Sequence, residues 1–388
     1  MIKEISIARY KSVVDLTLKL DRFNVFIGEN GCGKSNILEA IALGEAAHTH
    51  KLDYEFLANR GIRVTEPQFM LPAFDDIENN KDIKLAFKDD SNNSWIHLLH
   101  YDQETKPAMW RDEVEENTED LFIKLQQHFS QNKQINMDEF IKLWAEEHLN
   151  KTININISNK LPITIRKNKS KDLANFTIYS LEESSLRKFD TANTYPLGRK
   201  GEGLFAYLKS LSQQEKGLKI FQEIREGLSL LDWFEDIQIP ENLMSSDYSL
   251  KLSDRYLSET LNYFDQRSAN EGFLYLLFYL TLFISDDTPS FFAIENIESS
   301  YNPKLCREIV KRLYDLAVKH NKQVILTTHS PAVLNALPYS NEEQKLFVVR
   351  RTVDGYTKAN VVERKGETDT PMGQLWETGM IGGLPNNF

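Results

Sequence analysis

The first 27 residues carry an apolar pattern that predicts three strands. Residues 2–10 ("IKEISIARY") and 13–20 ("VVDLTLKL") mix apolar and polar positions, whereas residues 23–27 ("FNVFI") are almost continuously apolar. A run of the second kind is typical of a central strand that is buried on both faces. A helix is predicted over residues 34–47, and further strands are predicted within 83–102.

The second half of the chain alternates between strand and helix patterns. Residues 200–236 show helical spacing, and residues 273–284 form an apolar run of 12 residues, which predicts a buried helix because it is too short to span a bilayer. A strand, a helix and a strand then follow from residue 290 to residue 328, and a closing hairpin is predicted over 345–364. This alternation predicts a parallel α/β core.

The middle of the chain has a different character. Residues 120–150 have helical spacing, and "TININI" and "LPITIRK" (152–167) predict a hairpin. We therefore predict a head formed by residues 1–105 and 246–388, with residues 106–245 inserted as a mainly helical subdomain.

Composition limits the setting of the protein. The 388 residues carry a net charge of −11, which excludes a general nucleic-acid coat and leaves only a local basic patch, such as 165–172 ("IRKNKSKD"), for such a partner. A solvated hairpin turn is the plainer interpretation of that patch. The two cysteines, Cys32 and Cys306, have no framework spacing, so we expect a cytoplasmic protein without disulfides. No membrane contact is expected.

A phosphate-binding loop is the strongest motif. Gly28, Gly33, Lys34 and Ser35 satisfy G-x-x-x-x-G-K-S between an apolar strand and a helix, the context that the motif requires. The loop backbone and the helix N-terminus would hold phosphates, with Lys34 on the β- and γ-phosphates and Ser35 on Mg²⁺. The remaining candidate nucleotide-binding residues of this stretch are Asn30, Gly31 and Asn36.

This loop, after "ISIARYKS", resembles the ABC-type ATPases of the SMC, RecF and overcoming-lysogenization-defect (OLD) branch. The resemblance implies an α/β ABC-ATPase head with a P-loop and a mixed, largely parallel sheet. It also implies ATP and Mg²⁺ as cofactors and a homodimer or higher homo-oligomer, in which ATP lies between two heads. Only 59 residues follow His329, so we expect no toprim nuclease domain of the OLD type. The segment 375–388 ("LWETGMIGGLPNNF") also resembles the ending of such proteins.

Two further segments resemble the family's catalytic motifs. In "IENIESSYNP" (294–303), Glu295 matches the residue of the Mg²⁺ shell, and Asn296 falls where the family has its catalytic glutamate. Glu298 is an alternative base. In "QVILTTHSPAVLNAL", His329 matches the histidine that contacts the γ-phosphate and the attacking water.

The signature segment that one head offers to its partner has a weaker counterpart. In "RSANEGFLYLLFYL", Ser268 and Gly272 are the candidates, although a helix N-cap explains Ser268 almost as well.

These matches predict intact ATP binding and slow hydrolysis, because an amide at position 296 cannot act as a general base. The resemblance then implies a sensor or scaffold that regulates a separate effector, a toxin or a nuclease, in prokaryotic anti-phage defence. One alternative is a RecF-like DNA-repair ATPase that binds DNA. Another is a scaffold that binds ATP for assembly without hydrolysis.

Overall fold

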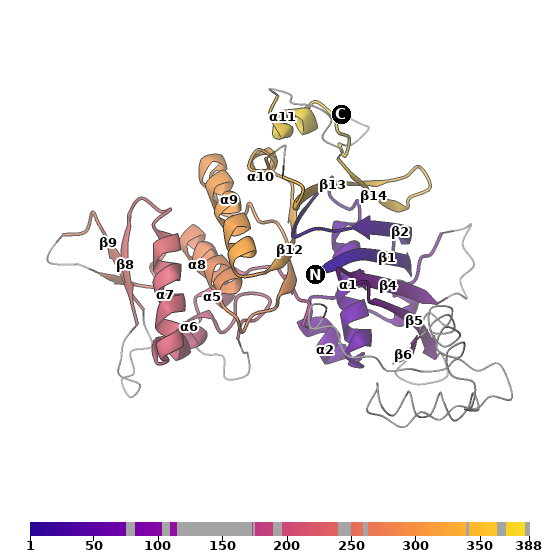
Figure 1. Ribbon diagram of the computed structural model, residues 1–388, viewed down its shortest axis with the longest axis horizontal. Helices are drawn as coiled ribbons and strands as arrows, with labels where there is room; N and C mark the ends of the chain where they lie inside the picture. Colours follow the sequence, from indigo (N-terminus) through magenta and orange to yellow (C-terminus); the bar gives the residue numbers. More distant parts are fainter. Residues whose placement is uncertain are drawn as a thin grey trace, which may run out of the picture.

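The computed structural model describes residues 1–74, 82–102, 109–114, 173, 175–188, 196–239, 250–258, 263–338, 341–362 and 370–384. Two sheets enclose the first long helix, α1 (Lys34–His48) (Figure 1). The first sheet is antiparallel, with the order β2-β1-β4-β5-β6. Its strands are β1 (Ile2–Tyr10), β2 (Val13–Lys19), β4 (Ile83–Asp89), β5 (Ser94–Asp102) and β6 (Met109–Val114).

The second sheet carries the site. Its order is β14-β13-β3-β12-β11-β7, and every neighbouring pair is parallel except β13 with β14. In this register Ile27 pairs with both Thr328 and Val348, so the carboxyl ends of the three middle strands meet at one edge. Its strands are β3 (Phe23–Ile27), β7 (Ile178–Tyr179), β11 (Phe291–Ile294), β12 (Gln323–Thr328), β13 (Gln344–Arg351) and β14 (Thr357–Val361).

The two faces of this sheet pack against different partners. One face lies against α1 and the antiparallel sheet, and the other lies against a group of helices (Figure 1). This explains the continuous apolar run of β3, which is buried at all five positions. The helices of the second face are α6 (Leu204–Ser212), α7 (Glu215–Leu228), α8 (Glu271–Ile284) and α9 (Pro303–Lys319).

Local sequence explains where the two longest of these helices begin. Asn302 caps α9 by accepting the Leu305 N–H, and Pro303 stands at the first helical position, where its missing N–H costs nothing. Asn270 caps α8 in the same way, through the Phe273 N–H at 2.8 Å. Helix α8 is buried almost all round because it lies in the middle of the helical layer.

Shorter elements complete the described chain. They are α2 (Tyr54–Asn59), the 3-10 helix η1 (Pro67–Met70), α5 (Glu183–Leu186), α10 (Pro331–Leu334), α11 (Met372–Glu377), and a small antiparallel sheet of β8 (Phe234–Gln238), β9 (Lys251–Asp254) and β10 (Phe264–Asp265). No helix of the described residues is both long and apolar enough to cross a membrane.

The α/β class and the strands and helices predicted at both ends of the chain are confirmed. The predicted helix over 120–150, the hairpin over 152–167 and the basic patch lie outside the described residues. The division at residues 106 and 245 stays a prediction. Within the predicted insert, β7 pairs with β11 as an edge strand of the core sheet, and α6 and α7 share the apolar core of α8 and α9.

Candidate nucleotide-binding site

The phosphate loop connects β3 to α1 and is held tightly by its neighbours. Gly33 has a φ of 108°, and a Cβ there would lie 2.0 Å from Thr357 Oγ1. A Cβ on Gly28 would lie 2.1 Å from the Val349 carbonyl oxygen. The β13–β14 hairpin therefore leaves no space for side chains at these two positions, which explains why the loop needs glycine there.

The loop offers donors to an anion. Lys34 is buried, and its Nζ donates to the carbonyl oxygens of Gly28 at 2.9 Å and Glu29 at 3.0 Å. Burial lowers the pKa of Lys34, and the charges of Cys32, Glu298 and Glu295 oppose this effect. No side chain caps the N-terminus of α1. Its first N–H groups lack intrahelical partners, so they are available to phosphate oxygens.

Ser35 and Glu295 meet although 260 positions separate them in the sequence. The Ser35 Oγ donates to Glu295 Oε1 at 2.5 Å. The Glu295 backbone N–H donates to the Tyr179 carbonyl oxygen at 2.9 Å, which fixes the residue directly after β11. A hydroxyl beside a carboxylate is the donor set that Mg²⁺ prefers, so these residues fit the predicted metal site.

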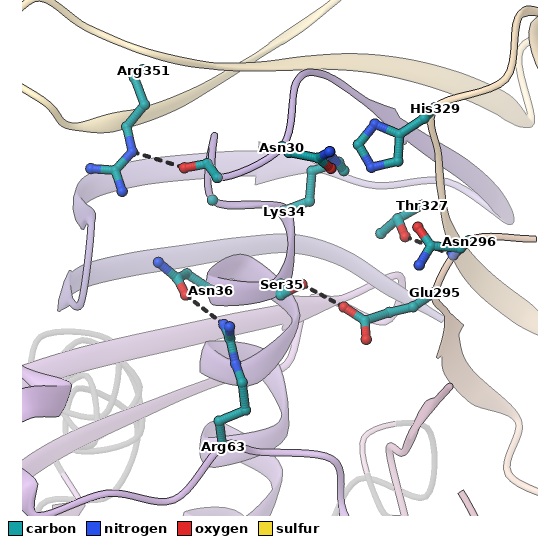
Figure 2. A pocket seen from close by; sticks show the side chains of 12 residues that line it. Asn30, Lys34, Ser35, Asn36, Arg63, Glu295, Asn296, Thr327, His329 and Arg351 are labelled. Carbon is teal, nitrogen blue, oxygen red and sulfur yellow. Dashed lines mark hydrogen bonds between the residues drawn. The ribbon is translucent and has the colours of Figure 1, made fainter. Parts of the chain in front are cut away.

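Asn296 follows and lies at the pocket, where Figure 2 shows its amide near Thr327 and His329. Its φ is 53°, a left-handed conformation that asparagine tolerates better than most residues. The Asn296 N–H donates to Thr327 Oγ1 at 3.1 Å. The chain therefore presents an exposed amide at the first position after Glu295, the predicted metal ligand.

Glu298 is engaged elsewhere. Its Oε1 accepts the backbone N–H of His329 at 2.8 Å, and its Oε2 is buried without a hydrogen-bond partner. Glu298 is not among the residues that line the pocket. This geometry favours a role in holding the His329 turn over the role of alternative base.

His329 lines the pocket beside Asn30 and Lys34 of the phosphate loop (Figure 2). Burial lowers the pKa of its imidazole, and the nearby Lys34 ammonium lowers it further, whereas Glu298 and the Gly28 backbone act in the opposite direction. The imidazole is therefore neutral at pH 7 in the nucleotide-free protein.

Two pocket residues belong to no sequence motif: Arg63 and Arg351. Arg63 donates through Nε to Glu39 Oε1 at 2.5 Å and through Nη2 to Asn36 Oδ1 at 3.0 Å. Arg351 donates through Nε to the Gly31 carbonyl oxygen at 3.1 Å (Figure 2). Two arginines thus add positive charge to a pocket of about 400 Å³. No local pattern marks them, because only the packing of distant segments brings them to the loop.

Ser268 and Gly272 lie outside this pocket. Ser268 is exposed in a turn, where its backbone N–H and hydroxyl both donate to Asp265. The interpretation of Ser268 as a helix N-cap is wrong, because Asn270 caps α8. Gly272 stands in the first turn of α8, and a Cβ there would lie 3.1 Å from the Ser300 carbonyl oxygen.

A phosphate loop, a serine–carboxylate pair and a histidine turn at one edge of a mixed sheet define an ATPase head of the ABC type, similar to those of SMC and RecF proteins. The family model described as "AAA domain, putative AbiEii toxin, Type IV TA system" matches residues 23–335, and the chain belongs to this family. None of the curated proteins matches the chain.

Solved structures support the fold. The chain is similar to the SmcHead bound to the C-winged helix domain of ScpA, with a TM-score of 0.54 and 13% identity over 93% of this chain and 97% of that chain. It is also similar to the Smc head domain with an extended coiled coil bound to the C-terminal domain of ScpA derived from Pyrococcus furiosus, with a TM-score of 0.50 and 13% identity over 93% and 96% of the two chains. The predicted ABC-ATPase head is thereby confirmed.

Proposed function

We propose that the protein is a cytoplasmic ATP-dependent switch. It binds ATP with Mg²⁺, assembles with further copies of itself around the nucleotide, hydrolyses ATP slowly, and through this cycle controls a separate effector protein. The observation that carries the proposal is that the Asn296 amide lines the pocket. The ABC-type ATPases that the sequence resembles have a catalytic glutamate at the matching position.

The binding part of the proposal rests on the donors of the site. Lys34, Arg63 and Arg351 supply positive charge, and the uncapped N-terminus of α1 supplies backbone N–H groups. Ser35 and Glu295 would hold Mg²⁺, which neutralises charge on the phosphate oxygens when it is bound. The site therefore suits a nucleoside triphosphate with its metal.

The slow step follows from the chemistry of the amide. A carboxylate can take a proton from water, but an amide can only orient water. Glu295 also lines the pocket but would be bound to Mg²⁺, which leaves His329 as the acid–base group near Asn296. The lowered pKa of His329 favours its neutral form, which accepts a hydrogen bond at one ring nitrogen. We infer that Asn296 and His329 position water, while no strong base removes its proton.

The effector part rests on the family. The description of the matching family names a toxin and a type IV toxin–antitoxin system. The two similar SMC heads are each bound to a domain of a separate protein, ScpA. A slowly hydrolysing head gives the ATP-bound assembly a long lifetime, which suits a protein that holds or releases a toxin or nuclease during anti-phage defence.

Three measurements on the purified protein test the proposal: ATP affinity by calorimetry, association by sedimentation with and without Mg-ATP, and steady-state phosphate release. We expect binding, ATP-dependent association and low turnover, with Lys34→Ala losing all three. Turnover as fast as that of an ABC ATPase with a catalytic glutamate would contradict the slow switch.

Two outcomes would favour the alternatives. Binding and association with no phosphate release above Lys34→Ala would indicate an assembly scaffold. Turnover that duplex DNA stimulates would indicate a RecF-like enzyme.

Copurification from the native host tests the effector part, because mass spectrometry identifies a bound effector. Recovery of the protein without a co-eluting toxin or nuclease, in the presence and absence of ATP, would contradict this part of the proposal.

A further inference from the structure

The segment 370–384 returns to the phosphate loop from the end of the closing hairpin. It begins with α11, which packs on α10, the short helix directly after the His329 turn (Figure 1). Three glycines with left-handed φ values then reverse the chain: Gly379 at 75°, Gly382 at 75° and Gly383 at 84°. We call residues 370–384 the glycine brace.

At its first end, the glycine brace contacts the histidine turn. A Cβ on Gly373 would lie 2.6 Å from the Pro331 carbonyl oxygen, so the two backbones touch with no space for a side chain. The Gly373 N–H donates to Asn335 Oδ1 at 2.7 Å. Pro331 is only two residues beyond His329, so this contact fixes the segment that carries the imidazole.

At its second end, the glycine brace packs against β13 near the phosphate loop. A Cβ on Gly383 would lie 2.6 Å from Val348 Cγ1 and 3.8 Å from the Gly28 Cα. On its other side Gly28 lies against the Val349 carbonyl oxygen. Gly28 therefore packs directly against β13, and Gly383 lies near it.

Gly28 is the residue through which this contact reaches the site. Its carbonyl oxygen accepts from Lys34 Nζ at 2.9 Å, and its backbone also interacts with the imidazole of His329. A movement of Gly28 would therefore displace both the Lys34 ammonium and the His329 imidazole.

We propose that the glycine brace is a positioning element of the ATPase, with Gly383 as the positioning residue that sets the distance between the phosphate loop and the His329 turn. This inference rests on the proposed nucleotide binding and hydrolysis. Gly373 has no space for a Cβ against Pro331, and Gly383 has none against Val348 in the strand that flanks Gly28. Because the glycine brace packs this tightly on the His329 turn and on β13, a partner that displaced it would change turnover without touching ATP.

The test compares two substitutions with the same backbone strain. Gly382 and Gly383 have φ values of 75° and 84°, but a Cβ on Gly382 meets nothing within 4 Å. Gly382→Ala therefore measures the cost of left-handed alanine alone. Gly383→Ala adds the contact with Val348, which must yield by about 1 Å to reach an ordinary carbon–carbon separation.

The readouts are ATP affinity and the turnover number, both measured at a temperature where every variant is folded by circular dichroism. A misplacement of about 1 Å costs on the order of 10²-fold in turnover. We expect Gly383→Ala to lose turnover by that factor, with a smaller loss in affinity, while Gly382→Ala stays near the wild type. The double variant Gly383→Ala/Val348→Ala removes the Cγ1 contact and should recover most of the turnover. Val348→Ala alone is its control.

The outcomes separate the inference from the proposed function. Equal turnover in the two alanine variants, with the wild type active, refutes the positioning role and leaves the ATPase intact. Loss in Gly383→Ala that Val348→Ala does not recover also refutes it, because the damage would then come from the backbone and not from the contact. A wild type that neither binds nor hydrolyses ATP refutes both proposals.

Discussion

Replacing Asn296 by glutamate should make the ATPase faster. The exchange places a carboxylate on the residue that directly follows Glu295, the proposed metal ligand, at the pocket and near His329. The Thr327 hydroxyl that holds the Asn296 backbone N–H is unaffected by the exchange, so the new side chain starts from the same backbone position.

The magnitude follows from the value of a general base. Proton transfer by a positioned side chain contributes about 10²–10⁴-fold, which corresponds to roughly 3–5 kcal/mol of activation free energy. The φ of 53° at position 296 favours asparagine, and glutamate there should cost roughly 1–2 kcal/mol of folding stability. We therefore expect turnover to rise towards the lower end of that range, and the protein to melt at a lower temperature.

Phosphate release under single-turnover and steady-state conditions measures the effect, and sedimentation or light scattering measures the lifetime of the ATP-bound assembly. Asn296→Gln is the matched control, because it has the length and backbone strain of glutamate without the charge. Turnover should rise and the lifetime should fall only in the glutamate variant. If both variants hydrolyse at the wild-type rate and Glu298→Gln abolishes hydrolysis, then Glu298 is the base and the assigned roles are wrong.

Three further predictions concern the rest of the site. Ser268→Arg should leave ATP affinity unchanged, because Ser268 lies outside the pocket of its own chain. The bulky side chain should block ATP-dependent association, because the exposed Ser268 is the predicted contact with a second head; unchanged sedimentation would show that it is not at the interface. In the nucleotide-free protein, NMR should place the pKa of His329 below about 6.5, and Lys34→Ala should raise it, because the ammonium repels the imidazolium. Since the folded pKa lies below the unfolded value, this histidine's contribution to stability is complete above about pH 6.5 and is lost as the pH falls further. Arg63→Ala should weaken ATP binding roughly tenfold and Arg63→Lys should recover only part, because the lysine ammonium lacks the planar fork that lets one guanidinium reach Glu39 and phosphate together; full recovery would contradict the fork geometry.

Much of the fold could be predicted from the sequence because its signals are local. The run "FNVFI" predicts a strand buried on both faces, and β3 is buried at every position. Asn302 and Pro303 predict the start of α9 through capping chemistry that involves only adjacent residues. The phosphate loop is recognisable for the same reason, since its glycines, lysine and serine lie at fixed spacing within residues 28–35.

The assembly of the site was decided by tertiary structure. Ser35 bonds Glu295, a pair that the resemblance to ABC-type ATPases assigns to one metal site. Arg63 bonds Asn36 and Arg351 bonds Gly31, and no pattern of spacing predicts these two contacts, because each depends on which segments become neighbours.

The glycines show the same distinction between local and tertiary information. The sequence marks Gly33 as part of a loop, but only the fold shows that Thr357 occupies the space of its missing side chain. It likewise shows that Val348 occupies the space of a side chain at Gly383. Sequence determines the conformations that a segment prefers, because those preferences arise within a few residues. The three-dimensional arrangement determines which side chains share a pocket, because strand order and packing bring together residues that lie hundreds of positions apart.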